Sequence, residues 1–444
     1  MANQFKTSRK TELVTLRALT SMNYLTVGSK KYFKDQLKHK RNGKKFEFVI
    51  TDAGEYQRGI DLSAGQNDSA SQGVSQLREK SVEKVLNVGN VLIATNLIEP
   101  VTDMNWEKEV AGPQGKKLAN GVVADAINGI KGKKIDGQTV TYYDGDFGQQ
   151  NTAFVGIGYE PLAGATNFLG SISDEQQYMF INPMINTKLS QTGKSFDPYQ
   201  AEPIYNKGVL GKYGECEVRA NKYMPLVFIK QDLVSDIANT TAVAYAESGN
   251  NDGLATLTFT GMTKKFPRGA VVKFDGVYAA DLVGDQTGEL RAFIAVEDSA
   301  SAGVMIVKAL SDEDWTGQGN KVICDADGKA LGATKAAAIT AFNTAASVSG
   351  AIQFMEAGKY YAGLVRLNGA MEFETVDEID ASNADTERAD NEGLVIFQNR
   401  GIDTIKGQNA TRWTTTVMSG IVEPRAVALI LVKDSTTNLV KVVQ

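Results

Sequence analysis

The stretch LATLTFTGMTKKFPRGAVVKF, from Leu254 to Phe274, decides the fold of this chain. Its first part alternates Leu257 and Phe259 with threonines, which is the two-residue period of a half-buried β-strand. Glycine and proline then interrupt the sequence at turn positions, and further alternating runs follow at 290–297 and 304–310. The stretch therefore predicts a small β-domain inserted into a larger chain.

The composition is that of a globular chain with two or three domains. It has 444 residues, of which 42% are hydrophobic and 22% are charged. No apolar run reaches the roughly 18 residues that span a bilayer, and the N-terminus lacks the apolar core of a signal peptide. We therefore expect synthesis in the cytoplasm and no membrane partner. Cys216 and Cys324 do not have metal-site spacing, and we expect two half-buried thiols.

The first 45 residues are strongly basic. They hold twelve lysines and arginines against Glu12 and Asp35, so this arm carries +10 and the remaining chain −15, for a total of −5. A basic arm on an acidic body predicts contact with phosphate or with an acidic protein surface. The alternative is a solvated basic helix that neutralises the acidic face of a neighbouring subunit.

The residue types argue against catalysis. His39 is the single histidine, and it lies in the run KHKRNGKK, which is typical of a solvated basic loop. GPQGKK at 112–117 and GVLGKYG at 208–214 lack the spacing and the hydroxyl residue of a phosphate-binding loop. CDADG at 324–328 lacks the closing glutamate of a calcium loop. We therefore expect no enzymatic activity, no cofactor and no metal site.

The N-terminal part predicts a helix and a projecting loop. From Ser8 to Leu25, apolar residues recur every three positions, which is typical of an amphipathic helix that needs a partner. Phe46–Ile50 and Val82–Ala94 are typical of strands. The polar stretch Gly54–Ser81 between them is too long for a compact connection, so it predicts a projecting arm.

The middle of the chain predicts mixed α/β structure. Trp106–Ile130 has the apolar period of a long helix, which either bends near Pro113 or begins with Pro113 at its first position. A second helix with a break at Pro161 is expected at Gln150–Leu169, and a buried strand is expected at Gln177–Ile181. Asn182 and Pro183 then fit the cap and first residue of another helix.

The C-terminal part predicts one helix and several strands. Ala333–Ala346 is alanine-rich and helical in character, and Asp377–Glu392 is polar without period, which predicts a surface loop. The expected strands are Lys359–Leu367, Leu394–Phe397, Trp413–Met418 and Arg425–Val432.

Four passages of the chain resemble one family of shell proteins. The turn TGM…RG…VKF within 260–274 is similar to the insertion domain in the coat proteins of short-tailed, Salmonella-infecting, double-stranded DNA phages. KKLANGVVADAING at 116–129 resembles the spine helix of that family, and YMFINP at 178–183 resembles its strand-to-Asn-Pro passage. VMSGIVEPRAVAL at 417–429 resembles its closing strand-turn-strand. The chain as a whole thus resembles the Hong Kong 97-type capsid fold.

The resemblance implies an α+β chain whose segments have named places in a shell subunit. The implied segments are a basic helical N-arm at 1–45, an extended-loop hairpin at 46–105, a spine helix with peripheral and first axial part at 106–228, an inserted small β-barrel domain at 229–347, and a second axial and peripheral part at 348–444.

The same resemblance implies the function of a major capsid protein. Many copies would form the hexamers and pentamers of an icosahedral shell, with a scaffolding protein, a portal protein and non-specifically contacted double-stranded DNA as partners. The expected location is the virion, after assembly in the bacterial host cytoplasm. The basic arm departs from the family, so a specific acidic docking residue for scaffold is not expected here.

Candidate contact residues follow from the arm, the loop and the insertion. The candidates for burial between subunits are Leu13, Leu16, Leu19, Ile60 and Leu62, with Glu247 and Asp252 as candidates for ion pairs between capsomers. The candidates for DNA or scaffold contact are Lys6, Arg9, Lys10, Arg17, Lys38, Lys40 and Arg41. The turn Ala246–Gly253, which holds the two acidic residues, has a plain hairpin turn as its alternative.

Two other functions fit parts of the pattern. A nanocompartment shell protein would share the fold and enclose an enzyme cargo in place of DNA. A β-rich phage tail or adhesion protein could also carry such an insertion, although the long helix and the amphipathic arm argue against it.

Overall fold

The structure is a computed structural model of the 444-residue chain. It describes residues 12, 14–19, 22–30, 45–52, 78–85, 87–96, 112–129, 134–135, 138–139, 145–185, 187, 212–214, 216–230, 233–248, 253–316, 321–348, 350–375, 386–391, 394–403 and 408–434. The chain divides into two compact units. Unit 1 comprises Met1–Glu47, Glu83–Asp146 and Met371–Val422, and unit 2 comprises Phe48–Val82, Phe147–Ala370 and Glu423–Gln444.

Unit 1 is built around one mostly antiparallel sheet with a long helix. Its strands run in the order β1 (Ser29–Lys30), β20 (Met371–Thr375), β23 (Gln408–Ile421), β22 (Leu394–Asp403) and β21 (Thr386–Asn391), and β4 (Asn87–Asn96) pairs with β23 along ten residues. The single parallel pair is β1 with β20 among the pairs given for this sheet. Helix α4 (Gly112–Asn128) contacts β4 and β23, and the short α2 (Asn23–Thr26) contacts β20.

Helix α4 buries the face that its sequence period predicts. Leu118, Val122 and Ala126 lie four apart and are buried, so they form the apolar stripe of the helix. The helix begins at Gly112, and Pro113 therefore lies in its first turn, where a missing N–H costs least. Residues 106–111 of the predicted helix lie outside the described residues.

The N-terminal helical residues pack through a different face from the predicted stripe. Val14 and Ala18 are fully buried, whereas Leu16 is 41% exposed. A Cβ on Gly115 of α4 would lie 2.6 Å from the Val14 carbonyl oxygen, so the two backbones approach closely because Gly115 has no side chain. The buried face therefore follows a four-residue step, and Leu16 is left to the surface.

Two predictions for the C-terminal part of unit 1 have different outcomes. The strand at 394–397 is confirmed within β22 and the strand at 413–418 within β23. The predicted loop at 377–392 is wrong for 386–391, which form β21 and pair with β22. Arg388 and Asp390 are exposed there, and charged residues are common on such edge strands.

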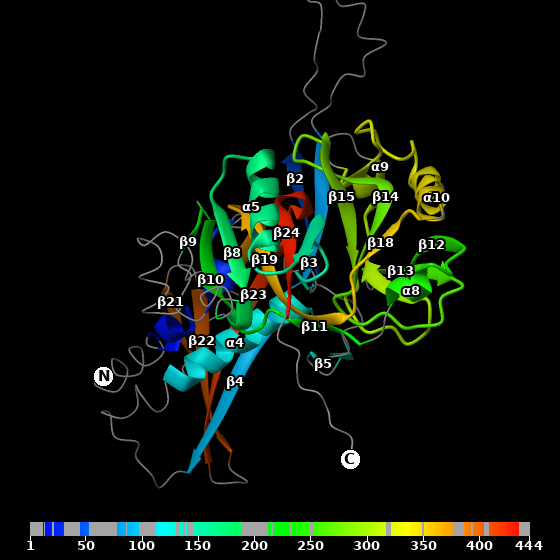
Figure 1. Cartoon of the computed structure of the whole chain (residues 1–444). Coiled ribbons are helices and arrows are strands. Elements are labelled where there is room, and N and C mark those ends of the chain that lie inside the picture. Colours follow the sequence, from blue (N-terminus) through cyan, green and yellow to red (C-terminus); the bar gives the residue numbers. More distant parts are fainter. Residues whose placement is uncertain are drawn as a thin grey trace, which may run out of the picture. The chain divides into compact units, whose positions relative to one another are not determined.

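Unit 2 contains a mixed seven-stranded sheet. Its order is β7 (Thr152–Gly156), β24 (Val427–Lys433), β19 (Gly358–Leu367), β8 (Gln177–Ile181), β10 (Cys216–Ala220) and β9 (Lys212–Tyr213), and β11 (Leu226–Ile229) pairs with the start of β19. β7 is parallel to β24 and β8 is parallel to β10. Helix α5 (Glu160–Ile172) contacts β7, β24 and β19, and Figure 1 shows it beside β19 and β24.

The start of this sheet corrects one prediction. Residues 152–156, expected as part of a helix, form the strand β7, and the helix α5 begins at Glu160 with Pro161 in its first turn. Phe154 of β7 is the register partner of Ile430 of β24, which lies 276 positions later in the chain. The strand at 177–181 is confirmed, and Met184 N donates to the Asn182 Oδ1 at 3.0 Å, as the predicted cap requires.

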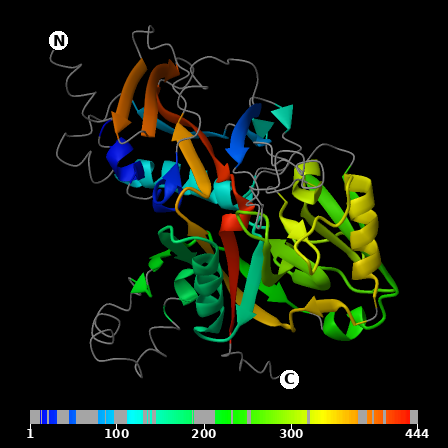
Figure 2. The same ribbon diagram turned by 90° about the horizontal axis from the view of Figure 1, so that it is seen from above.

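The chain between β11 and β19 forms two further sheets. The first has the order β12 (Ala242–Glu247), β13 (Leu254–Thr260) and β16 (Val304–Lys308), and the second has β15 (Gln286–Ile294), β14 (Val271–Ala280) and β17 (Ile323–Cys324), with β18 (Ile352–Phe354) also on β14. Helices α8 (Leu233–Ile237), α9 (Asp312–Thr316) and α10 (Lys335–Ala346) accompany them. Figure 2 shows α10 beside these strands.

The chain between β11 and β19 leaves the seven-stranded sheet and rejoins it at the same point. Ile229, the last residue of β11, is the register partner of Gly358, the first residue of β19. The intervening chain can therefore fold separately without breaking the sheet ladder. β18 lies beyond Ser347, the predicted end of the insertion, and still pairs with β14. We call residues 230–357 the excursion.

An aromatic cluster forms the core of the excursion. Phe342 of α10 lies between Phe274 of β14 and Trp315 of α9, with ring centroids 5.3 and 5.8 Å away. Tyr245 of β12 contacts Trp315 edge-on at 5.1 Å. Offset and edge-on rings of this kind stabilise beyond their buried area. The prediction of a half-buried strand at 254–260 is confirmed: in β13, Leu257 and Phe259 are buried, whereas Thr258 and Thr260 are exposed.

Four short or isolated strands complete the described elements. β2 (Lys45–Asp52) pairs with β3 (Arg78–Val85), and β5 (Lys134–Ile135) pairs with β6 (Gln138–Thr139). Residues 54–77 of the predicted projecting arm lie outside the described residues, and 78–81 belong to β3. A single 3₁₀ turn, η4 (Pro424–Ala426), precedes β24.

Candidate functional site

The described residues contain a buried polar joint and exposed apolar strand faces. Within those residues, no group of three or more histidine, cysteine or acidic side chains could hold a metal ion. In the same part of the chain, no helix is long and apolar enough to cross a membrane. Two features of unit 2 are described below: a set of buried hydrogen bonds within it, and apolar side chains that are exposed at its surface.

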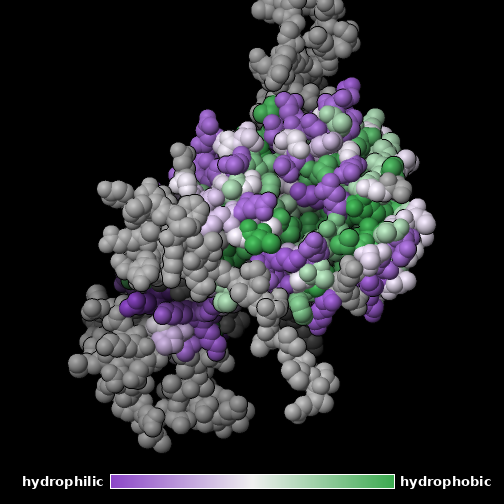
Figure 3. Space-filling model, viewed as in Figure 1, coloured by the Kyte–Doolittle hydropathy of each residue, from purple (hydrophilic) through white to green (hydrophobic). Residues whose placement is uncertain are grey.

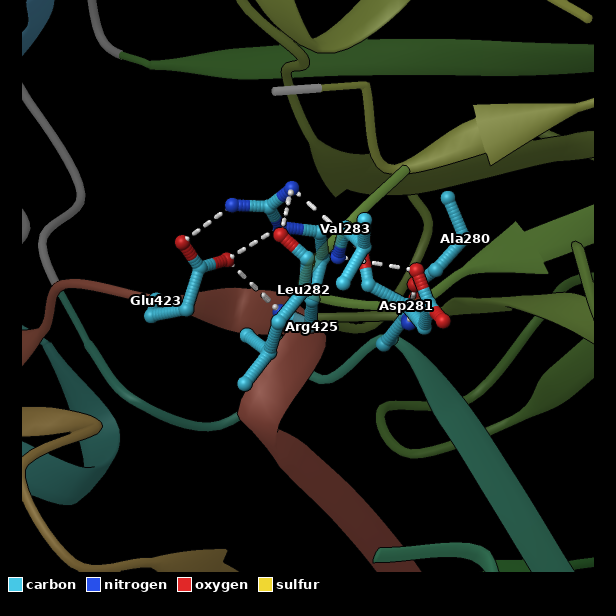
Figure 4. A network of polar contacts seen from close by, with 7 residues as sticks. Ala280, Asp281, Leu282, Val283, Glu423 and Arg425 are labelled. Carbon is cyan, nitrogen blue, oxygen red and sulfur yellow. Dashed lines mark hydrogen bonds and ion pairs between the residues drawn. The ribbon is translucent and has the colours of Figure 1, made fainter. Parts of the chain in front are cut away.

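Arg425 of η4 is the centre of the polar joint. Its side chain is 1% exposed, and its Nε and Nη2 donate to the two carboxylate oxygens of Glu423 at 2.8 and 2.7 Å. Its Nη1 donates to the carbonyl oxygens of Asp281 and Leu282 at 3.3 Å each, as Figure 4 shows. The two carbonyls belong to the turn between β14 and β15. One buried guanidinium therefore ties the start of β24 to the excursion.

Asn151, just before β7, adds a second tie to the same hairpin. Its Nδ2 donates to the Ala280 carbonyl at 2.8 Å, and its Oδ1 accepts from Arg291 Nη1 at 2.7 Å. Thr152 Oγ1 donates to the Leu290 carbonyl at 3.0 Å. These side chains are buried, and a buried polar group that lost its partner would destabilise the fold. The excursion is thus fastened to the sheet by specific hydrogen bonds.

Burial lowers the pKa of Arg291 in this joint. Desolvation lowers the pKa of its guanidinium to about 10, although Asp314 and Tyr245 oppose the shift. The group therefore remains protonated at neutral pH. Its side chain is 4% exposed, so it does not act as a surface cation.

Two strands of the seven-stranded sheet expose apolar side chains. On β11, Leu226 is 49% exposed and Phe228 is 47% exposed, while the alternate residues Val227 and Ile229 are buried. Ile157, which follows β7, is 61% exposed. Figure 3 shows hydrophobic patches among hydrophilic residues on the face in view. Strands that are apolar on both faces are typical of sheets that are covered on both faces.

Sequence reasoning did not single out these exposed residues. The signal was present in LVFI at 226–229, which is apolar at every position and so lacks the alternation of a strand with one face in water. The ties of Arg425 and Asn151 to the excursion had no local signal, because the carbonyl oxygens that they contact there lie more than 100 residues away.

Few of the predicted contact residues lie in the described part. Leu16 and Arg17 are exposed, and Leu19 is partly buried. Glu247, a candidate for an ion pair between capsomers, is paired within the chain to Lys335 at 2.7 Å, and Lys335 also contacts Asp312 at 2.6 Å. The candidates that lie outside the described residues are Lys6, Arg9, Lys10, Leu13, Lys38, Lys40, Arg41, Ile60, Leu62 and Asp252.

The two cysteines are free thiols in separate parts of unit 2. Cys216 and Cys324 are both buried. Burial raises the pKa of each thiol to about 12, with the neighbouring Glu217 adding to the effect at Cys216. Both thiols are therefore protonated and unreactive at neutral pH. They were expected to be half-buried, and they are fully buried, with Cys216 1% and Cys324 0% exposed.

Comparison with known proteins gave matches among solved structures. No protein-family model matches the sequence, and no curated protein matches it. A protein of Mycobacterium phage Che8 is 7% identical with a TM-score of 0.38, over 91% of this chain and 89% of that chain. The mature capsid of bacteriophage PhiM1 is 7% identical with a TM-score of 0.37, over 90% and 84%. The capsid of an empty GTA particle is 8% identical with a TM-score of 0.36, over 88% and 86%.

Proposed function

We propose that this chain is the major capsid protein of a double-stranded DNA phage, and that it acts as a shell subunit in many copies. The observation that carries the proposal is the order in which the chain builds its two units. Unit 1 contains β4 and α4 and, much later in the chain, β20–β23. Unit 2 contains β7–β19, which lie between them in sequence, and then β24. The four sequence passages that resemble capsid proteins imply this alternation between peripheral and axial parts.

The excursion supports the finer part of the proposal. It leaves the sheet at Ile229 and returns at Gly358, which is the topology of an insertion. We identify it with the inserted β-barrel domain of the short-tailed, Salmonella-type coat proteins. The joint at Arg425 and Asn151 would hold this domain against the axial sheet, so that the subunit presents both as one body to its neighbours.

Assembly would bury the apolar surfaces that the single chain leaves exposed. Leu16 on the N-terminal helix and Phe228 on β11 would contact neighbouring subunits. Burying one such side chain contributes about 1.5–3 kcal/mol, and a shell repeats the contact in every subunit. Heterologous contacts that close give a finite particle, whereas contacts that do not close give tubes or sheets.

The charge distribution supports a role for the arm inside the shell. An arm of +10 would contact phosphate without sequence specificity, in packaged DNA, or would bind an acidic scaffolding protein. A portal protein and a scaffolding protein complete the proposed set of partners. Assembly would take place in the host cytoplasm before DNA enters.

The test is expression of the chain with and without the products of its neighbouring genes, followed by electron microscopy. Closed shells are expected, and Leu16→Asp is expected to give soluble subunits without shells, because a charge would be buried between subunits. Glu12→Gln, an exposed change on the same helix, is the matched control and should assemble normally. Normal shells from Leu16→Asp would contradict this use of the helix.

The content of the particles separates the alternatives. Scaffold and DNA inside would support the capsid proposal, and an enzyme inside would indicate a nanocompartment. Fibres or tubes by negative stain, with no closed particles under any condition, would instead favour a tail or adhesion protein and would overturn the proposal.

A further inference from the structure

A cavity opens within unit 2, between the seven-stranded sheet and the excursion. Its volume is about 450 Å³. The apolar side chains of its wall are Val155 and Ile157 from β7 and the turn after it, Val271 of β14, and Phe354 and Met355 at the end of β18. Clefts that bind small molecules have volumes of roughly 300–1,000 Å³ and mostly apolar walls. The cavity therefore has the size and the lining of a site for a small apolar molecule.

Lys273 of β14 places an amine in the wall of this cavity. Its side chain is only 17% exposed. Its Nζ lies 3.7 Å from the Glu289 Oε2, which is too long for a hydrogen bond, and 5.6 Å from the centre of the Phe154 ring. Among the residues that the structure describes, no acceptor lies within hydrogen-bond distance of this Nζ. A largely covered ammonium group thus borders the cavity with its hydrogen-bonding capacity unused.

A second lysine of the same cavity is held differently. Lys433 of β24 contacts the Glu356 carboxylate at 2.6 Å, and this hydrogen bond raises the pKa of its ammonium group. At Lys273, desolvation lowers the pKa, because it outweighs the attraction of the more distant Glu289 carboxylate. The uncharged amine is the nucleophilic form of lysine, and burial without a close carboxylate favours that form. The two amines therefore differ in reactivity although they line one cavity.

The charges around the cavity decide which class of ligand fits. Lys433 and Glu356 neutralise each other, and Glu289 faces Lys273. Glu160 also lines the cavity, so the surroundings carry a net negative charge. A carboxylate ligand would be repelled by Glu160 and Glu289, and a cationic ligand would be repelled by Lys273. A neutral molecule avoids both penalties, and a carbonyl oxygen on it can accept the hydrogen bond that Lys273 leaves unmade.

We propose that this cavity binds neutral apolar carbonyl compounds, and that Lys273 forms an imine with those that are aldehydes. The ammonium group first gives one proton to water or to the Glu289 carboxylate. The Nζ lone pair then attacks the carbonyl carbon, the C=O π bond breaks, and a proton moves from nitrogen to oxygen. Loss of the hydroxyl group with the last amine hydrogen, as water, leaves the C=N bond. No oxidant or reductant takes part, and the inference does not depend on the proposed capsid function.

Labelling of the full-length chain with 2-naphthaldehyde at neutral pH tests the assignment. Sodium cyanoborohydride reduces each imine to a stable secondary amine, and peptide mass spectrometry locates the labelled lysines. We expect Lys273 to be labelled at least about tenfold faster than Lys433, because the cavity holds the aldehyde beside an amine that is free to attack. Lys222 and Lys230, two exposed lysines of unit 2, report general reactivity. Labelling of Lys273 no faster than these would overturn the proposal.

Competition shows whether the cavity is responsible. 2-Naphthamide has the same rings and a neutral carbonyl group but does not form an imine with lysine. An excess of it is expected to slow the labelling of Lys273 by about fivefold or more, because it occupies the cavity, and to leave Lys222 and Lys230 unchanged. Equal slowing at all three lysines, or no slowing at Lys273, would contradict binding in the cavity.

Glu356→Gln tests the reason for the difference between the two amines. Glu356 has a side chain that is 77% exposed, so its substitution leaves the fold intact. The variant removes the carboxylate that holds Lys433, and labelling of Lys433 should rise by about threefold or more while that of Lys273 stays the same. If Lys433 remains as slow as in the wild type, the missing carboxylate does not explain the reactivity of Lys273, and the assignment fails.

Discussion

Substitution of Arg425 by methionine removes the central guanidinium of the polar joint while keeping most of its length. The carboxylate of Glu423 then loses two hydrogen bonds of 2.8 and 2.7 Å, and the carbonyls of Asp281 and Leu282 lose weaker ones of 3.3 Å. A hydrogen bond to a charged group contributes about 1.5–3 kcal/mol. Glu423 is 23% exposed and regains some water, so we expect the lower end for each bond, a loss of about 3 kcal/mol in total.

Urea unfolding followed by tryptophan fluorescence measures this loss. Trp315 is fully buried in the excursion and reports on unit 2. With a urea dependence of about 3 kcal/mol per molar, the midpoint is expected to fall by about 1 M. The midpoint is the appropriate quantity, because a chain with two units need not unfold in a single step.

Two further variants test whether the loss of stability comes from breaking the joint or from removing a positive charge in general. Arg219→Met removes an ion pair to Glu217 in which both side chains are about one-third exposed, and it should cost about 0–1 kcal/mol. Adding Glu423→Gln to Arg425→Met should restore part of the loss, because no unpaired carboxylate remains. If Arg425→Met shifts the midpoint no more than Arg219→Met does, the joint does not hold the excursion as we describe.

Three other outcomes are expected. Gly115→Ala would place a methyl group 2.6 Å from the Val14 carbonyl oxygen, so it should lower the free energy of unfolding by about 1–3 kcal/mol in urea. Gly121→Ala, which has open space at its Cβ, is the control and should not lower the free energy of unfolding. The pKa of Asp236 is lowered because three hydrogen bonds to its carboxylate outweigh the effect of desolvation. Its stabilisation is therefore present above the unfolded pKa of about 3.9 and is lost as pH falls through the lower folded pKa. The stability gap between the wild type and Asp236→Asn should therefore begin to narrow on acidification from pH 6 to pH 3, as measured by urea unfolding at each pH. Both thiols should react with an aromatic disulfide reagent only upon unfolding, since burial raises the pKa of Cys216 and of Cys324 to about 12; fast reaction in the native protein would contradict their burial.

Local patterns in the sequence were sufficient for several elements. The alternation at 254–260 predicts β13, the four-residue apolar period predicts the core of α4, and Asn182 with Pro183 predicts a helix start. Each of these depends on residues within one or two turns or strand repeats of each other. That His39 is the single histidine, and that phosphate-loop spacing is absent, likewise needs nothing beyond the sequence.

Tertiary structure decided the features that depend on distant partners. Residues 152–156 form a strand because β24 pairs with them, although the local sequence favoured a helix. Val14 and Ala18 are buried because Gly115 lets the helices approach, which leaves Leu16 outside. Arg425 finds carbonyl oxygens 143 and 144 positions away. Such contacts depend on which segments the fold brings together, and neither period nor spacing within one segment contains that information.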